Sequence, residues 1–336
     1  MNPIERAARR IDTFQQGHTR VAFLFAVTKK FGDDNAGTLV SNLAYSAFGA
    51  IFPLLLLLVT VLGLVLSHYP GLHRSLVNST LSQFPVIGSE LSNIHAVQRG
   101  SALALVVSIV MLAWGTTGVA QAGLFTMAQV WNLPGPERPN FLTRVARSFG
   151  FLGVLGLGLI VTTVAASFGT YGRHNMVLGL VGELVAVLVN VGQYFLAFRV
   201  LTPKAVETRH LWPGAVVGGI GWTILQAAGG YLVGHDLRND SAVYGVFGFA
   251  LGLLAWIYIG VELSIYAAEV NTVLARKLWP RGMVQPPLTE ADQRSMALQA
   301  TQNQRRPEQQ VDVSFSEEPM SQEDYAAAHA TESDPP

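Results

Sequence analysis

The sequence predicts an all-α integral membrane protein, a bundle of six transmembrane helices with both termini in the cytoplasm. Half of the 336 residues are hydrophobic and only 13% are charged. Soluble domains carry about 25% charged residues. Six apolar runs are each long enough to cross a bilayer as a helix. Lysine and arginine gather on alternate sides of these runs, which fixes their orientation.

The composition also excludes several classes of function. The net charge is zero, so no global positive field favours a nucleic-acid partner. The chain has no cysteine, which excludes disulfides, thiolate nucleophiles and cysteine-containing zinc sites. Residues 1–35 are polar and precede an apolar run longer than the core of a secretory signal, so we expect no cleaved leader.

Residues 1–35 are expected to form a cytoplasmic or interfacial N-terminal helix region. Within it, residues 21–31 (VAFLFAVTKKF) place apolar side chains ahead of Lys29 and Lys30. Such a stretch can lie flat on the inner leaflet with its lysines at the lipid headgroups. An ordinary cytoplasmic helix fits the pattern equally well, and the sequence leaves both open.

Residues 36–281 are expected to form the membrane domain. Its spans fall at about 39–66, 101–120, 148–168, 177–200, 212–233 and 243–274. In the first span Pro53 removes one backbone hydrogen bond and bends the helix. The bend is expected to face other helices or a polar cavity, because lipid cannot satisfy the freed carbonyl. The loop His68–Arg99 suggests short amphipathic helices on the outer face of the bundle.

The later spans each carry a recognisable signal. The second continues as an apolar stretch that stops at Pro134, and the third is rich in glycine. The fourth is closed by Arg199, and the fifth opens at Trp212–Pro213, where proline loses no helical hydrogen bond. The sixth begins with nineteen uncharged residues, Val243–Val261. Glycines four residues apart in the last two spans serve bundle packing or an oligomer interface.

The loops determine the orientation. Of the 22 lysines and arginines, 18 fall on one set of alternating sides and 4 on the other. By the positive-inside rule both termini are cytoplasmic. Residues 282–336 are rich in Pro, Gln, Ser and Glu, so we expect a disordered cytoplasmic tail that is a candidate for binding a protein partner.

Two acidic residues of the last span are candidates for a polar pathway or gate. Glu262 and Glu269 lie seven residues apart, on one helical face. They are either buried in the bundle or merely interfacial, since an ionised carboxylate in hydrocarbon is costly. If they are buried, Arg199 at the same end of span 4 is the expected partner. The pair would then pin the helices or form a cytoplasmic gate.

A second group of polar residues lies on spans 1 and 4. It comprises Asn42, Tyr45, Glu183, Asn190, Gln193 and Tyr194. Such a stripe can line a path for lipid headgroups, or it can supply interhelical hydrogen bonds worth about 0.6 kcal/mol each; the second reading is favoured. The eight histidines have no metal-ligand spacing, and no nucleotide-binding motif occurs, so we expect no metal, no cofactor and no enzyme.

Several segments resemble the YihY/BrkB family of bacterial inner-membrane proteins, once mislabelled as a ribonuclease. They are AYSAFGAIFPLL (44–55), FRVLTP (198–203), LWPGAVVGGIGW (211–222) and LLAWIYIGVELSIYAAEVN (253–271). The resemblance covers roughly residues 20–280. Glu269 falls on the acidic position of the family ending, whereas Glu262 departs from it. The resemblance implies a multi-pass protein of the cytoplasmic membrane associated with envelope integrity, for which lipid transport has been proposed.

Two functions follow as expectations. The first is a carrier or flippase that moves lipid, or another envelope precursor, through an interior path. The second is a non-transporting scaffold or assembly factor that holds partners at the membrane. A polar cavity inside the bundle favours the first, and a tightly filled bundle with mutually satisfied polar groups favours the second.

Overall fold

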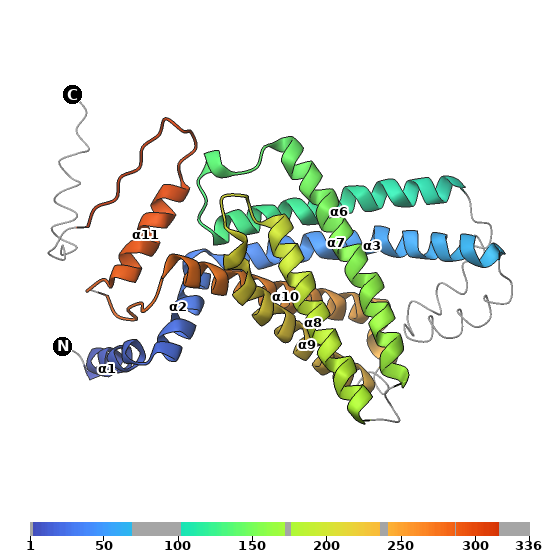
Figure 1. Ribbon diagram of the computed structural model, residues 1–336, viewed down its shortest axis with the longest axis horizontal. Helices are drawn as coiled ribbons and strands as arrows, with labels where there is room; N and C mark the ends of the chain where they lie inside the picture. Colours follow the sequence, from blue (N-terminus) through green and yellow to red (C-terminus); the bar gives the residue numbers. More distant parts are fainter. Residues whose placement is uncertain (1–2, 69–101, 172–175, 236–240, 286, 316–336) are drawn as a thin grey trace.

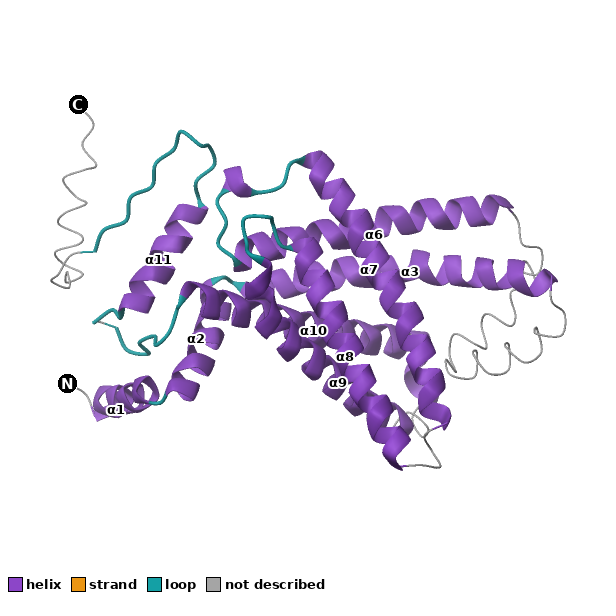
Figure 2. Ribbon diagram, in the orientation of Figure 1, coloured by secondary structure: helices purple, strands orange, loops and turns teal. Residues whose placement is uncertain are grey.

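A computed structural model describes residues 3–68, 102–171, 176–235, 241–285 and 287–315 (Figure 1). Within these ranges the regular structure is helical throughout and contains no strand (Figure 2). The prediction of an all-α chain is therefore confirmed. The amphipathic helices expected before Arg99 fall outside the described residues.

The fold is built from long helices, six of which, within the described ranges, have between 24 and 36 residues. At about 1.5 Å per residue, even the shortest exceeds about 30 Å of hydrocarbon. Three described stretches also combine sufficient length with high hydropathy: Phe141–Gly158, Leu180–Leu201 and Ala250–Arg276. The six helices are α3 (Ala36–His68), α6 (Ala102–Val130), α7 (Phe141–Tyr171), α8 (Met176–Leu201), α9 (Trp212–His235) and α10 (Ser241–Arg276).

Helix α10 is the centre of the arrangement, because it packs against α2, α3, α6 and α9. Figure 1 shows α3 and α6 running side by side, with α8, α9 and α10 grouped beside them and α7 crossing in front. The main core joins Val40 of α3, Trp131 just after α6 and Ile265 of α10, all 2% exposed or less. Helix α6 continues past residue 120, the predicted end of the span, to Val130; this extension lies within the apolar stretch that was expected to stop at Pro134, and its last turns are part of this core.

Glycines bring α8, α9 and α10 into backbone contact. The N–H of Gly214 donates to the side-chain oxygen of Asn271 at 2.6 Å. A Cβ at Gly219 would lie 2.6 Å from the Cα of Val191 on α8. Small residues allow such approach where a larger side chain would separate the helices. The glycine spacing noted in the sequence is thus used, at these positions, for packing within one chain.

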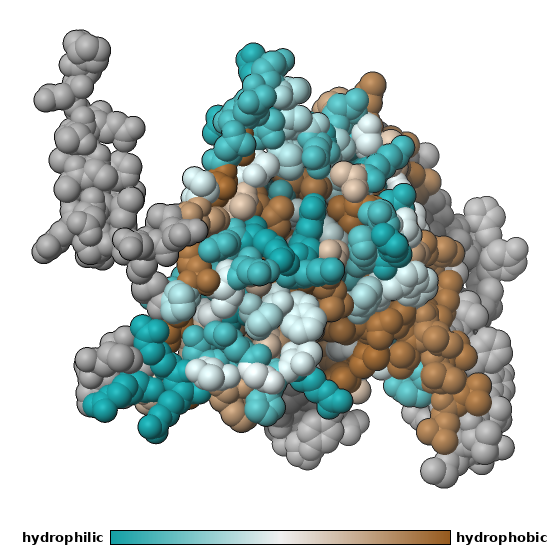
Figure 3. All heavy atoms as spheres, turned by 60° about the vertical axis from the view of Figure 1, so that its left-hand side comes forward, coloured by the Kyte–Doolittle hydropathy of each residue, from teal (hydrophilic) through white to brown (hydrophobic). Residues whose placement is uncertain are grey.

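Three shorter helices lie at one end of the bundle. They are α1 (Pro3–Gly17), α2 (Thr19–Asp33) and α11 (Glu290–Gln302). Figure 3 shows hydrophilic side chains gathered over this end, and hydrophobic ones over the long helices behind it. A polar cap on an apolar bundle is the arrangement expected where one end of the bundle meets water.

The expectation of a disordered tail is wrong for its first part. Residues 290–302 form α11, which begins with a reciprocal capping box between Thr289 and Asp292. Leu298 packs against the apolar cluster that α2 forms with the end of α10. The polar composition of residues 282–336, taken as a whole, predicted disorder. The helix forms nevertheless, because it docks on α2 and the end of α10. Residues 316–336 lie outside the described part of the chain.

The docking depends on a buried network around Asp292, which we call the tail network. Its carboxylate accepts hydrogen bonds from Lys29 Nζ and from Arg281 Nε, both at 2.9 Å. Arg281 also pairs with Asp33 at 2.6 Å. Arg281 is 1% exposed and Asp292 is fully buried. The network therefore ties α11 and the segment before it to α2.

A second contact, with α1, holds the same segment. The Asp12 carboxylate accepts the backbone N–H of Met283 at 2.9 Å and that of Val284 at 3.2 Å. Burial raises the pKa of Asp12, but these two bonds and those from Gln15 and Gln16 outweigh it and leave the pKa below its ordinary value. Asp12 is thus ionised at neutral pH and anchors the tail.

Candidate functional site

A cavity of about 350 Å³ lies inside the bundle; we call it the bundle cavity. It is at the low end of the range of about 300–1,000 Å³ found for ligand sites. All six long helices contribute to its wall, α9 through Trp222 alone. The lining is mostly apolar, with aromatic rings from Phe198, Trp222 and Trp256, and so differs from the polar cavity that was expected of a carrier. Such a wall suits a hydrocarbon chain.

The cavity also has a polar side, made by four residues. Asn190, Gln193 and Tyr194 come from α8, and Ser264 comes from α10. Asn190 donates to the Thr223 hydroxyl at 2.9 Å, and the hydroxyls of Tyr194 and Ser264 lie 3.0 Å apart. These bonds join α8 to α9 and to α10. Asn190 and Tyr194 therefore form interhelical hydrogen bonds, which was the favoured of the two interpretations of the polar stripe, although both residues also line the bundle cavity.

Gln193 packs against α7, whereas Asn190 and Tyr194 bond to α9 and α10. Its side-chain amide lies directly over Gly158 of α7, so close that a Cβ there would overlap it. The amide thus occupies space that a side chain on α7 would otherwise fill. Gln193 brings a donor and an acceptor to the cavity wall.

A second candidate site is the Lys30 cluster, which we define as Lys30, Asp34 and Glu269. All three side chains are 2% exposed or less. Lys30 Nζ donates to Asp34 and, at 3.1 Å, to the backbone carbonyl of Val130. It lies 3.6 Å from the nearer oxygen of Glu269. The cluster joins α2, α10 and the end of α6.

The Lys30 cluster corrects one expectation and bears on an alternative that the sequence left open. The partner of Glu269 is Lys30 and not Arg199, because α2 turns its buried face towards α10. Arg199 instead lies near Arg147, and the two positive charges repel each other. Lys30 is fully buried and Lys29 pairs with Asp292, so the structure favours the reading of residues 21–31 as a helix packed on the protein over one with both lysines free for lipid headgroups.

The remaining sequence candidates lie apart from the bundle cavity. Glu262 is only half-buried, so the two acids of the last span have different environments. Glu183 and Asn42 are exposed on α8 and α3. Tyr45 and Pro53 line a separate apolar groove of about 580 Å³ between α3 and α6. Helix α3 continues through Pro53, which faces α6, as expected for a proline within a span.

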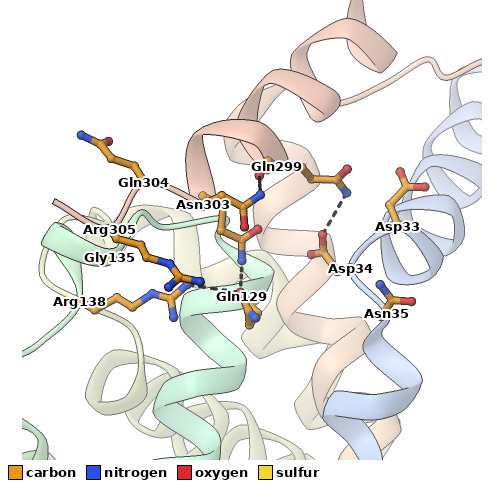
Figure 4. A pocket seen from close by; sticks show the side chains of 11 residues that line it. Asp33, Asp34, Asn35, Gln129, Gly135, Arg138, Gln299, Asn303, Gln304 and Arg305 are labelled. Carbon is orange, nitrogen blue, oxygen red and sulfur yellow. Dashed lines mark hydrogen bonds between the residues drawn. The ribbon is translucent and has the colours of Figure 1, made fainter. Parts of the chain in front are cut away.

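A third cavity, of about 450 Å³, lies beneath α11. Figure 4 shows Asp33 and Asp34 on one side of it and Arg138 and Arg305 on the other. Its two carboxylates are already neutralised, Asp33 by Arg281 and Asp34 by Lys30. Asn132 crosses the seam, donating to Asp34 at 3.2 Å and to Gln302 at 2.9 Å. We therefore read this cavity as the polar seam along which α11 docks.

Sequence reasoning missed Lys30, Asp292 and Arg281. The spacing of Thr289 and Asp292 before α11 is a capping-box signal and was available in the sequence. No comparable signal joins Lys30 to Glu269, because their contact depends on how α2 folds back onto α10. Among the described residues, no group of three His, Asp or Glu side chains is placed to hold a metal ion.

Comparison with known proteins gives a consistent result. The model of the family described as virulence factor BrkB matches residues 27–288. The putative ribonuclease-like protein YfkH of Bacillus subtilis is 24% identical over 265 residues, covering 70% of this chain and 89% of that protein. The UPF0761 membrane protein Smlt0865 of Stenotrophomonas maltophilia is 27% identical over 267 residues, covering 73% of this chain.

A Xanthomonas campestris relative, the UPF0761 membrane protein xcc-b100_3490, is 23% identical over 278 residues and covers 77% of this chain. The matches span 59% of the Stenotrophomonas protein and 62% of the Xanthomonas protein. These relatives are therefore longer than the region they share with this chain. No solved structure matches the chain significantly.

Proposed function

The chain belongs to the virulence factor BrkB family of membrane proteins, and we propose that it is a carrier or flippase for a lipid or another envelope precursor in the bacterial cytoplasmic membrane. The bundle cavity carries this proposal. It offers an apolar wall for an acyl chain and a polar side for a headgroup, within helices long enough to cross the bilayer. The role in envelope integrity follows from the same movement of envelope material.

The proposal includes six spans with both termini in the cytoplasm. The lengths of α3 and α6–α10 support it, as does the placement of 18 of the 22 lysines and arginines on one set of sides. Large apolar side chains are exposed on the outer faces of the bundle, among them Leu184 at 60% and Ile224 at 63%. Such exposure is costly in water and ordinary against lipid.

An amphiphile fits the cavity better than a fully polar solute does. Its lining is dominated by aromatic and aliphatic side chains, so a sugar or an ion would leave most of its hydrogen bonds unmade. A lipid can exchange hydrocarbon contacts with the bilayer for similar contacts inside. The sequence contains no nucleotide-binding motif, so we expect the movement to be passive, ion-coupled or driven by a partner.

A scaffold function is the second candidate, and a specific observation favours it. Asn190, Thr223, Tyr194 and Ser264 satisfy one another across the helices, as they would in a bundle built only to be stable. On this reading the cavity is a packing defect and the tail is the surface that partners bind. We do not propose ribonuclease activity, because its only basis here is the printed name of one relative, the putative ribonuclease-like protein YfkH.

Lipid movement in liposomes distinguishes the two functions. Ala197 lines the bundle cavity, whereas its neighbour Leu196 is 42% exposed on the outer face of α8. We expect wild-type protein to speed the transfer of a fluorescent phospholipid between leaflets. Ala197→Phe fills the cavity and is expected to reduce the rate to that of protein-free liposomes. Leu196→Phe, the matched control, is expected to keep the wild-type rate.

The readout is the fraction of fluorescent lipid that an external quencher can reach as a function of time. Equal rates in both variants would show that lipid does not use this cavity. A wild-type rate equal to the protein-free rate, for phospholipids of every headgroup tried, would favour the scaffold. Circular dichroism and size-exclusion profiles would confirm that both variants fold.

A further inference from the structure

The Lys30 cluster contains one cation and two carboxylates that are buried from solvent. Lys30 and Glu269 are fully buried, and the side chain of Asp34 is 2% exposed. With both acids ionised the cluster would carry one uncompensated negative charge. A buried unpaired charge costs several kcal/mol or more, and the usual way to avoid it is to take up a proton.

The hydrogen bonds decide which acid holds that proton. Asp34 accepts from Lys30, from Asn132 at 3.2 Å and from Gln299 at 3.5 Å, so its negative charge is well satisfied. From the described residues Glu269 accepts no hydrogen bond at either buried carboxylate oxygen, the ammonium group of Lys30 lying 3.6 Å away. The carboxylate with the fewest donors is the one least stable as an anion.

Other charged groups around the cluster are committed elsewhere. On α2, Lys29 pairs with Asp292, and Asp33 pairs with Arg281. On α10 itself, Glu262 lies about two turns away, Tyr266 stacks on Phe31, and Arg276 and Lys277 are exposed beyond the cluster. The end of α6 presents a neutral carbonyl, that of Val130, and the neutral side chain of Asn132. No second cation of these elements is placed to neutralise Glu269.

The cluster lies at the edge of the bundle cavity. Ile265, one helical turn before Glu269 on the same face of α10, lines that cavity. Loss of a proton from Glu269 would place a bare charge between α2, α6 and α10, and these helices would have to separate or admit water. The protonation state of Glu269 thereby sets the packing at this end of the cavity.

We propose that Glu269 is a proton-binding site and that the proton is the ion coupled to lipid movement. This inference rests on the proposed carrier function. Uptake of one proton from water converts the carboxylate to the neutral acid and brings the cluster from one net negative charge to zero. Lys30 and Asp34 remain an ion pair throughout.

The site itself is tested without transport, by infrared spectroscopy of purified protein exchanged between neutral and alkaline pH. We expect a carbonyl band of a protonated carboxylic acid at neutral pH, lost in Glu269→Gln and kept in Glu262→Gln. The glutamine retains the size and neutrality of the protonated acid, so the variant is expected to fold. Absence of a band that depends on Glu269 would overturn the proton site.

Coupling is tested in liposomes with a pH gradient, no sodium and a fluorescent phospholipid as the probe. We expect the gradient to accelerate lipid transfer by wild type and by Glu262→Gln, and the acceleration to be lost in Glu269→Gln. An equal effect of the gradient on wild type and Glu269→Gln would overturn the coupling. If wild type moves no lipid under any gradient, the proposed carrier function fails, while the infrared band still decides whether Glu269 binds a proton.

Discussion

Gly214→Ala is expected to lower the midpoint of thermal unfolding in detergent by about 5–10 °C, the upper part of what an overpacking cost of about 1–3 kcal/mol produces. A methyl group at this position would overlap the backbone carbonyl oxygen of Ala267 on α10. It would also displace Asn271, whose side chain accepts the N–H of Gly214 at 2.6 Å. Because a carbonyl oxygen cannot rotate away, α9 and α10 must move apart.

The matched control for this change is Gly252→Ala on α10. A methyl group there meets nothing within 4 Å, and alanine favours a helix over glycine by about 0.5–1 kcal/mol. The midpoint of Gly252→Ala is therefore expected to equal or slightly exceed that of wild type. Equal midpoints for the two variants would contradict the close approach of α9 to α10.

Asp292→Asn is expected to release α11 from the bundle. The change leaves Arg281, which is 1% exposed, and Lys29 without their shared carboxylate. Breaking a buried ion pair costs about 3–5 kcal/mol, and α11 has only 13 residues with which to offset that loss. Hydrogen–deuterium exchange is expected to show loss of amide protection in residues 290–302, with little change in α6–α10.

Glu290→Gln provides the comparison on the same helix. Glu290 pairs with Arg294 at 2.8 Å, but its side chain is 85% exposed. Exposed pairs of this kind contribute about 0.3–0.5 kcal/mol, so amide protection of α11 is expected to be unchanged. If Asp292→Asn also leaves the protection unchanged, the tail network does not hold the helix.

The tail network also predicts how docking depends on pH. Burial raises the pKa of Asp292, but hydrogen bonds from Gly282, Lys29, Thr289 and Arg281 outweigh it and hold the pKa well below the ordinary value of 3.8. The ordinary value of 3.8 is the pKa that Asp292 has in the unfolded chain. The stabilisation is therefore fully present when the pH is above 3.8, and it is lost as the pH falls from there towards the lower pKa of the folded chain. Protection of α11 is expected to be flat from neutral pH to about 5 and to fall in stronger acid.

The sequence was sufficient for features that depend on composition and local pattern. Long uncharged runs such as Val243–Val261 predicted helices that the structure contains, although α6 ends at Val130 rather than near residue 120 and α7 begins at Phe141 rather than near residue 148. The interhelical bonds of Asn190 and Tyr194 follow from polar side chains within apolar helices. The family resemblance, based on segments such as residues 253–271, is confirmed by the family model.

Features that depend on how distant segments meet were not accessible in the same way. Arg199 was the natural partner for Glu269 by position along the membrane normal, but position along one axis does not determine which helices are neighbours. The partner of Glu269 is Lys30 of α2. Lys30 follows a run of apolar residues, a pattern that is typical of a lysine at a membrane surface. The docking of α11 was not accessible for a similar reason, since its burial is supplied by α2 and the end of α10, although the capping box of Thr289 and Asp292 could have indicated where the helix begins.

Accessibility of single cysteines tests the six-span arrangement most directly, because the natural chain has no cysteine and needs no prior replacement. Cysteines would be placed singly at Thr19, Glu137 and Thr208, which are exposed in the structure, and at Ser75 and Asp236 in the segments predicted to lie outside. In intact spheroplasts a membrane-impermeant maleimide is expected to label only Ser75→Cys and Asp236→Cys. In inverted vesicles it is expected to label only the other three variants. Labelling of Thr19→Cys and Thr208→Cys from opposite sides, or of Thr19→Cys and Ser75→Cys from the same side, would contradict a bundle of six spans with both termini in the cytoplasm.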